Sequence, residues 1–95
     1  MKSVGIDIQI CRNPKQIFNE IDGHIVMLDI NNETYYSLDD VGSSIWRELA
    51  EPCKIEQLID KLVNSYEVTH SQCREDIEPF IDELISAGVI KIIND

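Results

Sequence analysis

The chain has 95 residues, of which 43% are hydrophobic, and its 18 acidic and 8 basic residues give a net charge of −10. This length predicts one domain, 1–95, with a single hydrophobic core. The negative charge repels phosphate backbones and attracts basic partners, which counts against nucleic acid as a ligand. No apolar run approaches the ~20 residues of a membrane span, and residues 1–7 lack the apolar stretch of a signal peptide, so we expect a cytoplasmic protein without membrane contact.

The three cysteines, Cys11, Cys53 and Cys73, are an odd number and have no Cys-x-x-Cys spacing. This pattern favours reduced thiols packed inside the fold over a disulfide framework or a zinc site. We therefore expect neither a metal nor a cofactor.

The first element in chain order is a strand over 4–10, where apolar residues occupy every second position. Asn13-Pro14 ends it, so 1–14 form an extra N-terminal strand and a linker. The alternation leaves three partners open for this strand. It can extend the sheet that follows at its first edge, cover that sheet's second face, or pair with a second copy of the protein.

A three-stranded antiparallel meander follows, with strands predicted at 16–21, 24–30 and 33–38. Asp22-Gly23 suits a type I′ hairpin turn, and Asn31-Asn32 tolerates the left-handed conformation that a second tight turn requires. Two-residue turns also fix which residues face one another across the strands.

The predicted register places Phe18 and Tyr36 on either side of Met27, and Ile25 opposite Leu38. These residues form one apolar face of the meander. The other face is apolar as well, so part of it should be covered. It carries Ile17, Ile21, Val26, Leu28, Ile30 and Tyr35.

After Leu38 the hydrophobic period changes from two to 3.6 residues, which predicts helices. Asp39 or Asp40 caps a first helix that ends before Pro52. A second, strongly amphipathic helix spans 55–66.

The third helix begins at Thr69 with a capping-box pattern and ends at Gly88. Pro79 lies within it and predicts a kink or two shorter helices. A short strand over 89–93 completes the chain. The order of three strands, three helices and one strand predicts an α+β domain resembling a winged helix.

Catalytic chemistry has little support in the sequence. His24 and His70 have no Ser or Cys partner at a motif spacing, and the pairs Asp39-Asp40 and Glu75-Asp76 lie where helix dipoles favour acidic residues. There is no glycine-rich phosphate loop. A DNA-reading helix is also disfavoured, because the third helix carries one basic residue, Arg74, among five acidic ones. We therefore expect a protein that is not an enzyme.

The last meander strand, 33–38, contains no Lys or Pro, the residues that commonly block an exposed sheet edge. If the third helix lies alongside, strand and helix form an apolar groove that can capture a peptide by β-augmentation. The alternative is that Tyr35 and Tyr36 are ordinary core and rim aromatics.

Several segments, taken together, are similar to the PqqD-like family, and to the leader-recognition proteins of lasso-peptide biosynthesis in particular. The similarity covers about 16–93. The segments are 22–29 (DGHIVMLD), 35–42 (YYSLDDVG), Ile45-Trp46, 55–66, 80–84 (FIDEL) and 87–90 (AGVI).

This resemblance implies a winged-helix-like recognition element for ribosomally synthesised and post-translationally modified peptides (RiPPs). Such proteins bind the leader segment of a precursor peptide as an extra strand, beside the third helix, and present it to a separate processing enzyme. In lasso systems that enzyme is a cysteine protease followed by a cyclase, and in other members it is a radical SAM enzyme.

The resemblance also implies site residues. The strand wall is Glu33, Thr34, Tyr35 and Tyr36, and the helix wall is drawn from Cys73, Arg74, Ile77 and Ile81. Tyr36, Leu38 and Trp46 match core positions of the family. Asp39 replaces the usual Asn, and Pro79 departs from the family pattern. A transcriptional winged helix and a small self-associating scaffold are the competing hypotheses, and the oligomeric state is left open.

Overall fold

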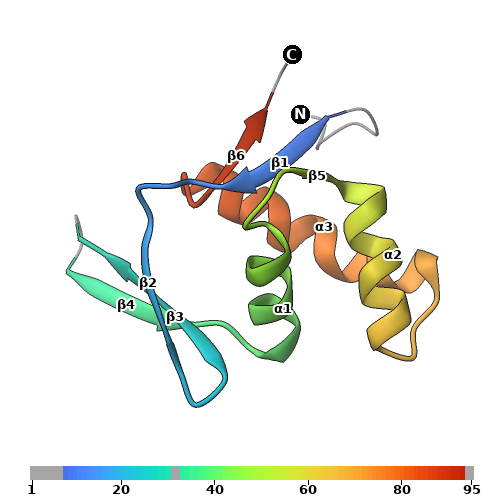
Figure 1. Cartoon of the computed structure of the whole chain (residues 1–95), viewed down its shortest axis with the longest axis horizontal. Coiled ribbons are helices and arrows are strands. Elements are labelled where there is room, and N and C mark those ends of the chain that lie inside the picture. The colour runs from blue at the N-terminus through green and yellow to red at the C-terminus, as the bar shows by residue number, and fades with distance from the viewer. Residues whose placement is uncertain (1–7, 31–32, 94–95) are drawn as a thin grey trace.

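Two three-stranded antiparallel sheets and three helices surround one hydrophobic core in the computed structural model, which describes residues 8–30 and 33–93 (Figure 1). One sheet is an N-terminal meander, and the helices and a C-terminal strand follow it. The predicted α+β architecture is therefore confirmed. Within the described residues, no helix is long and apolar enough to cross a membrane.

The meander consists of β2 (Ile17–Ile21), β3 (His24–Asp29) and β4 (Thr34–Ser37). Asp22 and Gly23 both have positive φ angles, 53° and 84°, as a type I′ turn requires. The Asn31-Asn32 turn lies outside the described residues.

The predicted register is confirmed. Met27 pairs with Phe18 on β2 and with Tyr36 on β4. Beyond β4, the Leu38 backbone N–H donates to the Ile25 carbonyl at 2.8 Å, which continues the same ladder.

The second sheet joins the two ends of the described chain. β1 (Gln9–Arg12) lies between β6 (Ile90–Ile93) and the two-residue β5 (Cys53–Lys54). None of the three partners considered for an N-terminal strand is the one observed. Ile10 is 0% exposed, because this pairing turns it into the core. Residues 4–7 of the predicted strand lie outside the described residues.

The three helices are α1 (Asp40–Glu48), α2 (Ile55–Ser65) and α3 (His70–Ser86). Asp39 and Thr69 cap the first and third of them: their side-chain oxygens accept hydrogen bonds from the backbone N–H groups of Gly42 and Gln72, at 2.8 and 3.1 Å. Both caps agree with the sequence patterns.

Helix α3 continues through Pro79, so the prediction of two shorter helices is wrong. Pro79 and Glu75 are both exposed, and water can hydrogen-bond the Glu75 carbonyl that proline leaves without a donor. The helix ends at Ser86, and Gly88, just beyond it, has a φ of 80° that allows the Val89 N–H to reach the Leu84 carbonyl at 2.9 Å. This closure is a Schellman motif.

Trp46 of α1 lies at the centre of the core and is 1% exposed. Its ring meets Phe18 edge-on, with 5.1 Å between centroids, and the Arg12 guanidinium lies 4.9 Å from both ring centroids. Leu38 is buried as predicted, at 6% exposure. Tyr36 is 39% exposed, so its prediction as a core position is wrong. The side chain borders a cavity.

Candidate functional site

Strand β4 forms an edge of the meander, and all four of its residues are exposed. In an antiparallel ladder, alternate residues direct their backbone N–H and C=O groups to the same neighbour. Leu38 bonds to Ile25 on the β3 side, so Tyr36 and Thr34 also face β3. Tyr35 and Ser37 therefore direct their backbone groups outward, to the open edge.

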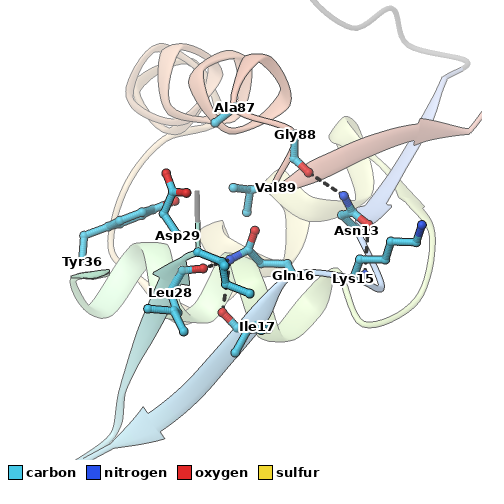
Figure 2. Close-up of a pocket in the computed structure, with 11 residues that line it drawn as sticks. Asn13, Lys15, Gln16, Ile17, Leu28, Asp29, Tyr36, Ala87, Gly88 and Val89 are labelled. Atoms are coloured by element: carbon cyan, nitrogen blue, oxygen red, sulfur yellow. Dashed lines mark hydrogen bonds between the residues drawn. The ribbon is translucent and has the colours of Figure 1, made fainter. Parts of the chain in front are cut away.

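A cavity of about 690 Å³ lies between the meander and the end of α3 (Figure 2). Leu28, Asp29 and Tyr36 border it on the meander side, and the turn from Ala87 to Val89 borders it opposite. The remaining lining residues are Asn13, Lys15, Gln16, Ile17 and Ile30.

A second cavity, of about 540 Å³, lies where β4, α1 and α3 meet. A Cβ atom on Gly42 would be 3.2 Å from the Phe80 ring, so the glycine lets α1 and α3 approach closely. The lining residues are Ser37, Leu38, Asp39, Val41, Gly42, Ile45, Asp76, Ile77 and Phe80.

The two cavities lie along one strand, because Tyr36 borders the first and Ser37 the second. Four residues of α3 and its C-terminal cap face β4 across these cavities. They are spaced by four, three and four positions, which places them on one side of a helix. We call the space between β4 and these residues the β4–α3 groove. Its helix side consists of Asp76, Phe80, Glu83 and Ala87.

The groove is electronegative beside Tyr36. Burial raises the pKa of the Tyr36 phenol, and the nearby carboxylates of Asp29 and Glu83 raise it further. Among the described residues that line the two cavities, Lys15 is the only basic one. Figure 2 shows its ammonium group directed away from Tyr36.

The structure places the predicted strand-wall residues at the edge itself. Glu33, Thr34 and Tyr35 are exposed, and Glu33 has a φ of 54° where the chain enters β4. Tyr35 is 74% exposed and lies on the face away from α3, whereas Tyr36 borders the groove.

The predicted helix-wall residues are more scattered. Cys73 and Ile81 are 4% and 1% exposed and pack in the core, while Ile77 borders the second cavity. Arg74 forms ion pairs with Glu56 of α2 and with Glu78, the latter at 2.8 Å, so it faces α2. A contact between these residues and a peptide stays a prediction.

Sequence reasoning missed Asp76, Phe80, Glu83 and Ala87 as groove residues. They flank the buried stripe of α3 on the side away from α2. Their helical spacing is visible in the sequence. Identifying them as groove residues requires knowing which element lies beside that face of α3.

Both histidines pair with carboxylates at the surface, His24 with Asp40 at 2.9 Å and His70 with Asp60 at 2.8 Å. In the part of the chain that the structure describes, no group of three or more His, Cys, Asp or Glu residues is arranged to hold a metal ion.

Residues 24–90 match the model of the family described as coenzyme PQQ synthesis protein D (PqqD). The fold is also similar to the solved structure "TbiB1 in Complex with the TbiA(beta) Leader Peptide", with a TM-score of 0.76 and 27% sequence identity. That match covers 90% of this chain and 99% of the other. No curated protein sequence matches the chain. The family model matches well over half of this chain, and the chain therefore belongs to the PqqD family.

Proposed function

We propose that this protein recognises the leader segment of a ribosomally synthesised precursor peptide, without catalysing a reaction itself. The open edge of β4 beside α3 is the observation that carries this proposal. The family match and the likeness to a protein solved with a leader peptide support it.

The leader would bind as an additional strand. Tyr35 and Ser37 offer outward backbone groups to it, and main-chain hydrogen bonds of this kind supply affinity in β-augmentation. Its alternate side chains would enter the two cavities and supply selectivity. In this arrangement Ile77, Phe80 and Asp76 form the helix wall at one end, and Glu83 and Ala87 form it at the other.

The bound precursor would then reach a separate processing enzyme. A leader protease and cyclase of lasso-peptide maturation are the first candidates, on the resemblance of segments such as 35–42 (YYSLDDVG). A radical SAM enzyme is the second, on the family match. The genes beside this one distinguish them, because each system places its own enzyme next to the precursor.

The binding test uses a synthetic leader from the neighbouring precursor gene, titrated against the full chain by calorimetry. Tyr35→Pro removes an outward N–H group without breaking the β3–β4 ladder, and the proline ring would project toward the added strand. We expect about tenfold weaker binding, the equivalent of ~1.4 kcal/mol for a lost hydrogen bond and a clash.

Tyr35→Ala is the matched control, because it removes the same side chain but keeps the N–H group. It should bind within about threefold of the unmodified protein, since Tyr35 is 74% exposed and its side chain lies on the other face. Equal binding by both variants, or no binding by the unmodified protein, would rule out strand addition at β4.

A further inference from the structure

The helix side of the β4–α3 groove carries two carboxylates, and neither is neutralised by a basic side chain in the described residues. Asp76 borders the second cavity, and Glu83 lies on the same side of α3, between Phe80 and Ala87, which border the second and first cavities.

Lys15, the one basic residue among the described residues that line the two cavities, directs its ammonium group away from Tyr36 (Figure 2). Three other basic residues pair with acidic side chains outside the groove. Arg74, the only basic residue of α3, pairs with Glu56 and Glu78 on the α2 side. Arg47 pairs with Glu20 at 2.9 Å, and Lys61 pairs with Glu48 at 2.8 Å. The negative potential of the groove is therefore left for a ligand to balance.

Strand geometry restricts where a balancing charge can lie. Side chains directly opposite each other on paired strands project from the same face of the sheet. Tyr36 projects toward the groove, so the ligand residue opposite Tyr36, and those two positions away, also project toward α3. Their neighbours in the ligand project from the opposite face, beside Tyr35 and away from Glu83.

We propose that the β4–α3 groove selects a leader segment with a Lys or Arg side chain at an α3-facing position next to Tyr36, where it pairs with Glu83. This inference rests on the proposed function and names the chemistry of its ligand.

The test compares Glu83→Gln with Glu75→Gln, using the synthetic leader of the neighbouring precursor gene. Both variants remove one exposed negative charge from α3, but Glu75 lies on the side of the helix away from the groove. We expect Glu83→Gln to weaken binding about three- to fivefold and Glu75→Gln to leave it within about 1.5-fold. The loss should shrink between 50 and 500 mM salt because salt screens the pair.

The position of the ligand's charge is tested with leader copies in which each Lys or Arg is replaced singly by Glu. One replacement, at an α3-facing position, should weaken binding to the unmodified protein. The same leader copy should bind the Glu83→Lys variant better than the unreplaced leader does, and a double-mutant cycle measures this coupling. Coupling at an outward-facing position, or at none, would overturn the inference.

Failure of this inference is distinguishable from failure of the proposed function. If the leader binds and loses affinity with Tyr35→Pro, but Glu83→Gln and Glu75→Gln change its affinity equally, only the proposed charge selection is wrong. If the leader does not bind the unmodified protein, the proposed function is wrong, and the inference with it.

Discussion

The two faces of the meander are almost equally apolar, yet only one of them supplies fully buried side chains to the core. Met27 and Leu28 are neighbours on β3 and point to opposite faces. Met27 is 0% exposed beneath the helices, and Leu28 is 38% exposed on the other side. Ile17 and Tyr35, which pair on either side of Leu28, are 47% and 74% exposed. Apolar composition alone therefore does not tell which face of a strand supports the fold.

The largest expected effect comes from truncating these two neighbours in turn. Met27→Ala removes a fully buried side chain and should lower the free energy of unfolding by about 2–5 kcal/mol. Leu28→Ala should lower it by less than about 1 kcal/mol, because its side chain already contacts water. Urea denaturation followed by far-UV circular dichroism measures both. Similar losses would mean that the outer face is covered in solution.

A smaller effect is expected at Ser43, which connects the inner face to α1. Its fully buried hydroxyl accepts a hydrogen bond from the Ile25 N–H at 3.0 Å and donates to the Leu38 carbonyl at 3.3 Å. Ser43→Ala leaves both groups without this partner and should cost about 1–3 kcal/mol of stability. Ser71→Ala, at an exposed position of α3, is the control and should change stability by less than about 0.5 kcal/mol. Equal losses would show that the hydroxyl does not hold β3 to α1.

The smallest effect is a change in the titration of Tyr36. Because its pKa is raised in the folded protein, the phenol's contribution to stability is complete below about pH 10 and is lost as pH rises through the folded pKa. Glu83→Gln should lower that pKa by removing a nearby negative charge. Absorbance at 295 nm follows the phenolate, and Tyr36→Phe identifies its share of the signal. An unchanged titration in Glu83→Gln would place the carboxylate outside the groove.

Local chemistry made the meander and the helix ends predictable. Asp22-Gly23 accommodates two positive φ angles at little cost, so it fixed the hairpin and the register of Met27 against its neighbours. Thr69 and Gly88 likewise identified both ends of α3.

Contacts between distant parts of the chain were not predictable in the same way. Nothing local to Ile10 shows that its partner is Ile92, because that pairing depends on where the helices bring the chain. The same limit applies to the groove. Periodicity identifies the most buried stripe of α3, through Cys73 and Ile81, whereas the proposed ligand would contact the less apolar flank that contains Glu83.

The pairing of β1 with β6 has a practical consequence for tethering. Gln9 and Ile93 are partners across the two strands, so both ends of the described chain leave the fold side by side, at the opposite end from the β2–β3 turn (Figure 1). An enzyme joined by a linker to either end would start from the same place relative to the groove. Linker length, more than the choice of terminus, would then set its effective concentration at a bound peptide.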